Sequence, residues 1–189
     1  MKKLLSVVTL FTFFMLLNLT SAQDTTPPIL SNPMPQNGTY IRGGATYSFS
    51  IEIDEPNLDE TSVKLHIGSE EVWPDERGIV TMNCFKIDTT KWRCNTSVMI
   101  AVAETGTKEY FYFEAKDLNG NVGTLASVDE PFFMIIDREP PVVEAANFNN
   151  RSYIGVTNRL SFDIKDFLSG VNASSVFVFW KYENETWSS

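Results

Sequence analysis

Oxygen-bearing side chains form the most suggestive chemical pattern in this sequence of 189 residues. Asp117, Asn119 and Asn121 alternate along the chain as at the start of an EF-hand loop, which binds Ca²⁺ through carboxylate and amide oxygens. The EF-hand pattern then fails, because Val122 and Val128 stand where that loop needs Gly and Glu. A tight turn is therefore the better interpretation of this segment.

A calcium site could still form if folding brought carboxylates from separate segments together. Two of them lie in a proline-containing linker, and others lie at the ends of expected strands. Carboxylates that meet between neighbouring modules would bind Ca²⁺ and stiffen the array. The candidate ligands are Asp117, Asp137 and Glu139, near which Asp54, Glu55 and Asp166 could also lie. Mutual repulsion diluted by solvent is the alternative, and no other cofactor is indicated.

Catalytic chemistry is poorly represented. The chain has one histidine and two cysteines, and it contains no G-x-S-x-G, H-E-x-x-H or phosphate-loop motif. Adjacent acids such as Asp59 and Glu60 are more simply solvated charge on a strand. We therefore expect no active site. Four tryptophans could stack on sugar rings if they shared an exposed face, although core packing is the more ordinary role. They are Trp73, Trp92, Trp180 and Trp187.

Charge and the N-terminal segment favour export. With 24 acidic and 15 basic residues the formal net charge is −9, which disfavours nucleic-acid partners. Lys2 and Lys3 precede an apolar stretch and small residues that end at Ala22, the layout of a secretory signal peptide over 1–22. Removing both lysines changes the charge from −9 to −11. A retained anchor is the alternative, but the stretch is shorter than the roughly 20 residues that span a bilayer, and no later segment could cross one.

Cysteines and sequons also favour an extracellular or cell-surface location. Cys84 and Cys94 are the only cysteines, and a turn between them would place them opposite each other on paired strands as a disulfide. Two free buried thiols are the alternative. Five sequons make the protein a candidate glycoprotein. The acceptor residues would be Asn37, Asn95, Asn150, Asn172 and Asn184.

The elements that must hold these residues are β-strands. Apolar and polar residues alternate with a period of two, which puts one face of each strand inward. On one such strand Val63, Leu65 and Ile67 point inward, and His66 points outward as a surface residue. The expected strands cover 47–53, 63–67, 79–87, 92–102, 108–116 and 131–136. Seven or so short strands in about 110 residues indicate an all-β, immunoglobulin-like Greek-key sandwich.

An internal repeat sets the length of one module. The register holds without a gap for 48 positions with 12 identities at a spacing of 113 residues, which starts at Asp24 and Asp137. The second copy has no counterpart of residues 74–136. The predicted organisation is a signal peptide over 1–22, a complete module over 23–136 and the N-terminal part of a second module over 137–189. A short, degenerate second domain is the alternative.

Three motifs recur at the turns and boundaries of the expected modules. They are Asp24-x-x-Pro27-Pro28, Ala115-x-Asp117-x-x-Gly120-Asn121 and Asp166-x-x-Ser169-Gly170-Val171. With these motifs the chain resembles the tandem Ig-like modules of prokaryotic secreted and cell-surface proteins. The resemblance implies spacer, stalk or adhesion duties, with surface proteins or glycans as partners and with neighbouring modules in the same chain. The sequons beside such a signal peptide suit an archaeal surface protein.

The predicted function is therefore a non-catalytic structural or adhesive role outside the cell. The alternative is an accessory or carbohydrate-binding module of an extracellular hydrolase, a peptidase or glycoside hydrolase, whose catalytic domain lies outside these residues. In that case the modules would serve an enzyme without performing its chemistry.

Overall fold

The computed structural model describes residues 24–75, 78–147 and 161–178. The predicted signal peptide therefore lies outside the described residues. The same holds for two of the sequons and two of the tryptophans, which are Asn150, Asn184, Trp180 and Trp187. Within the described ranges, no helix combines the length and the apolar character needed to cross a membrane.

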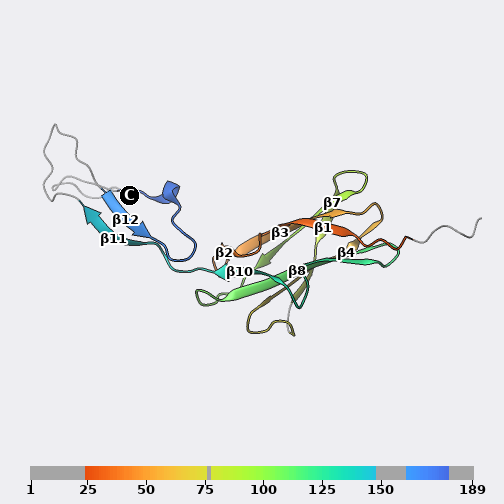
Figure 1. The fold of residues 1–189 in the computed structure, drawn as a ribbon, viewed down its shortest axis with the longest axis horizontal. Helices are drawn as coiled ribbons and strands as arrows, with labels where there is room; N and C mark the ends of the chain where they lie inside the picture. The colour runs from red at the N-terminus through yellow and green to blue at the C-terminus, as the bar shows by residue number, and fades with distance from the viewer. Residues whose placement is uncertain (1–23, 76–77, 148–160, 179–189) are drawn as a thin grey trace, which may run out of the picture.

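The first module is a sandwich of two β-sheets (Figure 1). One sheet has the order β1-β3-β7-β6, formed by β1 (Ile29–Met34), β3 (Thr46–Asp54), β7 (Lys91–Met99) and β6 (Asn83–Lys86). The other has the order β2-β10-β8-β4-β5, formed by β2 (Thr39–Ile41), β10 (Phe132–Ile136), β8 (Lys108–Asp117), β4 (Leu58–Ser69) and β5 (Gly78–Thr81). The short β9 (Val122–Leu125) pairs with β8. This strand order is that of an immunoglobulin-like Greek key, so the predicted fold class is confirmed.

The core lies between the sheets and consists of the alternating apolar residues. Phe49, Val63, Leu65, Phe111 and Phe113 are all fully buried, as the period of two predicts. The rings of Phe49 and Phe111 meet edge to face across the two sheets, with their centroids 5.5 Å apart. The strand faces therefore follow from the sequence pattern alone.

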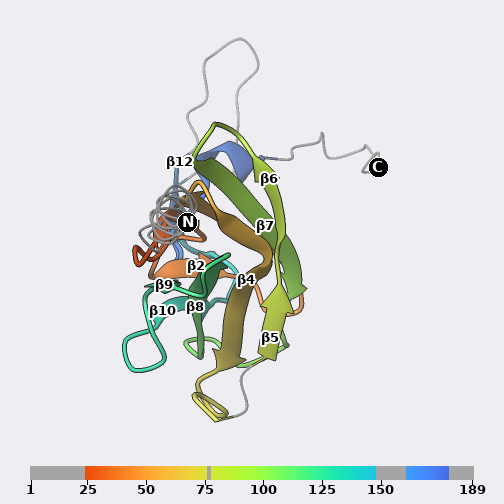
Figure 2. The same ribbon diagram turned by 90° about the vertical axis from the view of Figure 1, so that its right-hand side faces the viewer.

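The segment expected as one strand over 79–87 is two strands on different sheets (Figure 2). β5 pairs with β4, whereas β6 pairs with β7. Met82 lies at the crossing point, where it is buried and donates its backbone N–H to the carbonyl of Val63 at 2.9 Å. The sequence gives no sign of the crossing, because Met82 is itself a core residue and the apolar pattern of the segment continues through it.

The prediction that His66 is a surface residue is wrong. It is only 5% exposed, and its ring stacks on Tyr112 with the centroids 4.2 Å apart. Trp73, in the segment that follows β4, lies edge-on to the same tyrosine ring. The outer face of this sheet is therefore covered by aromatic side chains, including one from the segment after β4. The alternation of residues along β4 alone does not show that cover.

The predicted disulfide is confirmed. Cys84 on β6 and Cys94 on β7 are direct cross-strand partners, with their Cα atoms 4.0 Å apart, and they are bonded. Cys94 is fully buried in the core. The bond therefore joins an edge strand of this sheet to its neighbour.

The described part of the second module is smaller. β11 (Val142–Asn147) and β12 (Ser161–Lys165) pair antiparallel, and a 3₁₀ turn, η1 (Ala173–Ser175), follows them. β11 and β12 occupy the repeat positions of β1 and β3, which also pair antiparallel. Figure 1 shows the pair joined to the sandwich by the single segment 137–141 between β10 and β11.

Candidate functional site

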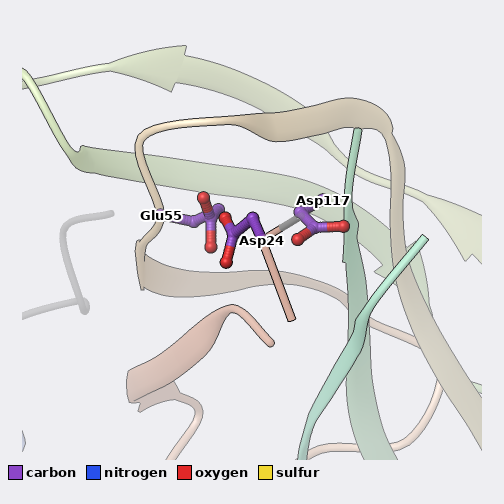
Figure 3. Close-up of side chains that lie close together, drawn as sticks. All are labelled: Asp24, Glu55 and Asp117. Carbon is purple, nitrogen blue, oxygen red and sulfur yellow. The ribbon is translucent and has the colours of Figure 1, made fainter. Parts of the chain in front are cut away.

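Three carboxylates converge at one end of the first module, which we call the N-terminal pole. They belong to Asp24, Glu55 and Asp117, and one oxygen from each lies within 4.8 Å of the others. Figure 3 shows the three side chains together, coming from the segment before β1, the end of β3 and the end of β8. Glu55 and Asp117 are only 3% and 2% exposed, which is unusual for acidic side chains.

Backbone and side-chain bonds hold Glu55 in place. Its N–H donates to the carbonyl of Thr90 at 2.7 Å, and its own carbonyl accepts from the indole N–H of Trp92 at 2.8 Å. Its carboxylate accepts a hydrogen bond from the backbone N–H of Asn57 at 2.8 Å. The turn after β3 thus presents this carboxylate to the pole.

Asn121 ties the other two acids together. Oδ1 of Asp117 accepts from the backbone N–H groups of Asn119 and Asn121, and Oδ2 accepts from the Asn121 side-chain amide at 2.6 Å. The same amide donates to the backbone carbonyl of Asp24 at 3.0 Å. The segment after β8 is therefore a turn organised by Asp117, as the sequence predicted, and the turn also holds the entering chain.

Burial and hydrogen bonding act in opposite directions on the Asp117 carboxylate. Burial by itself would raise the pKa of Asp117, but the hydrogen bonds from Asn121, Asn119 and Gly120 together outweigh burial and lower the pKa. Asp117 therefore stays ionised. None of the ion pairs among the described residues involves the three acids of the pole. Carboxylate oxygens are ligands that suit Ca²⁺ or Mg²⁺.

The predicted ligand set of Asp117, Asp137 and Glu139 does not form one site. At one end of β8, Lys108 pairs with Ile135, next to which the linker begins, and at the other end Asp117 pairs with Leu58. Ten strand residues at about 3.4 Å each separate these ends by about 30 Å. Grouping Asp117 with the two linker acids was therefore wrong, and its neighbours are Glu55 and Asp24 instead.

Sequence reasoning missed Asp24 as a candidate ligand, although a signal for it existed. Asp24 and Asp137 are counterparts in the internal repeat, and both make the same local turn. Each accepts a hydrogen bond at 3.0 Å from the backbone N–H two residues later, from Thr26 in the first module and from Glu139 in the second. A ligand role considered for one should have been considered for the other.

The second module carries its own pair of acids near the linker. Asp166 directly follows β12, at the repeat position of Ile53 rather than of Glu55, and it accepts from the N–H of Leu168 at 3.0 Å, a bond that is the main cause of its lowered pKa. Asp137 accepts from the N–H of Ser169 at 3.2 Å. Asp137, Glu139 and Asp166 line a shallow pocket, but in the described ranges only the pole of the first module brings three such ligand atoms within 4.8 Å.

The two described tryptophans do not share a face. The indole of Trp73 donates to the carbonyl of Val128 and packs on the tyrosines outside the sheet of β4 and β8. Trp92 belongs to the other sheet, where it donates to Glu55 and is partly buried against the core. These two side chains therefore form no common platform for a sugar ring.

Three of the predicted acceptor asparagines lie within the described residues, and all three are exposed. They are Asn37, Asn95 and Asn172. Asn95 stands on β7, and Asn37 accepts a hydrogen bond from the N–H of Phe133 through its side-chain oxygen. In the third sequon, the hydroxyl of Ser174 donates to the side-chain oxygen of Asn172 at 2.7 Å. Their exposure leaves room for a glycan at each position.

The fold and its disulfide define the class of this protein as an Ig-like β-sandwich module. No family model and no curated protein matches the chain. Among solved structures the chain is similar to a GspB Siglec domain, with 13% sequence identity and a TM-score of 0.42. The match covers 68% of this chain and 63% of that one, so it spans less than two thirds of the compared structure.

Proposed function

We propose that the protein is an exported Ig-like repeat protein whose modules act as structural spacers at the cell surface. The observation that carries this proposal is the internal repeat in three dimensions: the same aspartate turn, two prolines and antiparallel strand pair begin each module. Pro140 and Pro141 fix φ in the linker and keep it extended. The disulfide supports an oxidising compartment.

A replacement experiment tests the spacer role. In the protein as its own cells produce it, residues 24–136 are exchanged for an unrelated Ig-like module of similar length. A spacer tolerates this exchange, because only its length and stiffness matter. Deletion of the same residues should abolish the surface phenotype, by which we mean the display of the rest of the protein at a distance from the cell. Failure of the exchanged module to restore the phenotype would show that a specific surface of this module is needed, as in adhesion or in service to a hydrolase.

Location is tested separately on intact cells. A membrane-impermeant label should react with the protein, and mass spectrometry should find a mature chain that begins at Gln23. A chain that keeps Met1, is protected from the label and carries two reactive thiols would contradict export. The same spectra show whether Asn37, Asn95 and Asn172 carry glycans.

We also propose that the N-terminal pole binds Ca²⁺ through Asp24, Glu55 and Asp117. The supporting observation is the convergence of three carboxylates, two of them buried, without an ion-pair partner among the described residues. A cation there would offset their repulsion and fasten the entering segment to the turns after β3 and β8. In an array this would stiffen the junction on that side of the module.

Calorimetric titration of the mature chain with CaCl₂ after chelator treatment tests this proposal. Glu55→Gln removes one ligand charge, and Glu104→Gln, an exposed acid in the loop before β8, is the matched control. We expect Ca²⁺ binding in the wild type and in the control, and at least tenfold weaker binding in Glu55→Gln. Absence of heat in the wild type, or equal weakening in both variants, would end the proposal.

A further inference from the structure

A cleft of about 200 Å³ opens between the two sheets of the first module, at the end of β8 away from the N-terminal pole. We call it the Glu109 cleft, after the acid that lines it. One wall is the end of β4, including Ile67, and the other is the end of β7, including Val98 and Met99. These two β7 residues lie beyond the part of the strand that pairs with β6, which ends at Asn95. The cleft therefore opens where β6 no longer extends the sheet.

Glu109 reaches the cleft from the inward face of β8. The inward side chains of this strand are, in order, Glu109, Phe111, Phe113, Ala115 and Asp117. An acid thus stands at each end of a row whose middle belongs to the core. Glu109 is only 5% exposed, which is unusual for an acidic side chain.

The two acids of this row differ in their partners. Asp117 accepts hydrogen bonds from Asn121 through both of its carboxylate oxygens. Among the described residues, the carboxyl group of Glu109 takes part in no hydrogen bond and no ion pair. The neighbouring Lys108 belongs to the outward face, where its ammonium group lies 5.2 Å from the centroid of the Phe133 ring. Burial disfavours the charged form of Glu109 and so raises its pKa.

The lining of the cleft selects one kind of ligand. Of its described lining residues, Glu109 alone has an ionisable side chain, and Ile67, Val98 and Met99 make the walls largely apolar. One carboxyl group supplies too few oxygens for Ca²⁺, which takes about six to eight. An ammonium group, in contrast, donates strong charge-assisted hydrogen bonds to a single carboxylate. A short alkyl chain attached to it can lie against apolar walls while its charged end reaches the acid.

We propose that the Glu109 cleft binds a primary ammonium group carried on a short unbranched alkyl chain. The ammonium group would donate to the carboxylate of Glu109, and the methylene groups would contact Ile67, Val98 and Met99. The bound charge would favour the ionised carboxylate and so oppose the effect of burial. Small alkylamines and the lysine side chains of other proteins both carry this group. The inference concerns the opposite end of β8 from the proposed Ca²⁺ site, and it does not depend on the spacer role.

A methyl NMR titration of the whole chain with n-butylammonium chloride, at neutral pH and constant ionic strength, tests the proposal. We expect the methyl signals of Ile67, Val98 and Met99 to shift and to reach saturation. Affinity should fall at least about tenfold in Glu109→Gln, because the charge-assisted hydrogen bond is lost. It should stay unchanged in the matched control Glu104→Gln, which removes the charge of an exposed acid in the loop before β8.

A neutral ligand and a second amine complete the experiment. n-Butanol, which has nearly the same size and no charge, should bind the wild type at least about tenfold more weakly than the amine. The methyl signals of Val63 and Leu65 in the core should keep their positions in both variants, which reports that the fold is retained. Nα-acetyl-lysine methylamide distinguishes the two sources: if it binds, the cleft takes a lysine side chain, and if only the butylammonium ion binds, the cleft takes a free amine.

Three results would overturn the proposal. The first is the absence of any shift of the cleft methyl signals when the amine is added to the wild type. The second is binding of the amine by Glu109→Gln that is no weaker than binding by Glu104→Gln. The third is equal affinity of the wild type for n-butanol and the amine, because the cleft would then recognise only the alkyl chain.

Discussion

Breaking the Cys84–Cys94 bond should destabilise the first module by an amount that the loop length sets. The two cysteines are 10 residues apart, and closing so short a loop in the unfolded chain removes conformational entropy worth about 2.7 kcal/mol at 25 °C. Reduction alone should cost about that much. Replacing both residues with alanine should cost about 1 kcal/mol more, because Cys94 is fully buried and its sulfur would leave a small cavity.

Urea unfolding followed by tryptophan fluorescence measures this loss. With an m value of about 1.5 kcal/mol/M, a loss of 2.7 kcal/mol lowers the midpoint by about 1.8 M. The oxidised and reduced wild type differ only in the bond, so their comparison excludes packing changes from the substitutions. The module should remain folded without denaturant, because domains of this size have about 5–15 kcal/mol of stability.

Two results would refute this reasoning. A midpoint shift below about 0.5 M with an unchanged slope would mean that the unfolded chain already holds the β6–β7 turn closed, so that the bond removes little entropy. Detection of two reactive thiols in the protein before any reductant is added would refute the bond itself. A loss of unfolding free energy far above 4 kcal/mol would instead indicate a change of fold, which would also change the m value of the urea transition.

Three further predictions concern the same module. Gly123→Ala should lower the free energy of unfolding by at least about 3 kcal/mol or prevent folding, because a Cβ there would lie 2.1 Å from the carbonyl oxygen of Pro28. Gly78→Ala is the control, since the atom nearest to its added Cβ is 3.6 Å away, and it should change the thermal midpoint little. Burial raises the pKa of Glu109 above its ordinary value, so the contribution of this one group to stability is fully present below its unfolded-state pKa and is lost as pH rises through its folded-state pKa. Glu109→Gln should remove this loss, so the difference in stability between wild type and variant should change with pH, and a difference that is constant with pH would count against the prediction. Trp92→Phe removes the donor to the Glu55 carbonyl and should cost about 1 kcal/mol in urea unfolding, with weaker Ca²⁺ binding in calorimetry.

Sequence alone determined the local features of this protein. The inward faces of β3, β4 and β8 follow from alternation, because a strand turns each side chain to the opposite side of the sheet from the last. The Cys84–Cys94 pair follows from a short turn between two strands, and the Asp117 turn follows from residues that tolerate turn geometry. Each of these depends on residues within about ten positions of one another.

The tertiary structure decided what distant segments do to each other. The ring of His66 is covered by that of Tyr112 on the neighbouring strand, which Trp73 contacts in turn. The crossing at Met82 depends on the sheet that each neighbouring strand joins. The carboxylate cluster joins Asp24 to Asp117 from nearly opposite ends of the first module's sequence. The sequence supplied the acids, but which of them meet depends on which strand ends share a pole. That is set by the pairing of whole sheets, because strand order places residues side by side without regard to their separation along the chain.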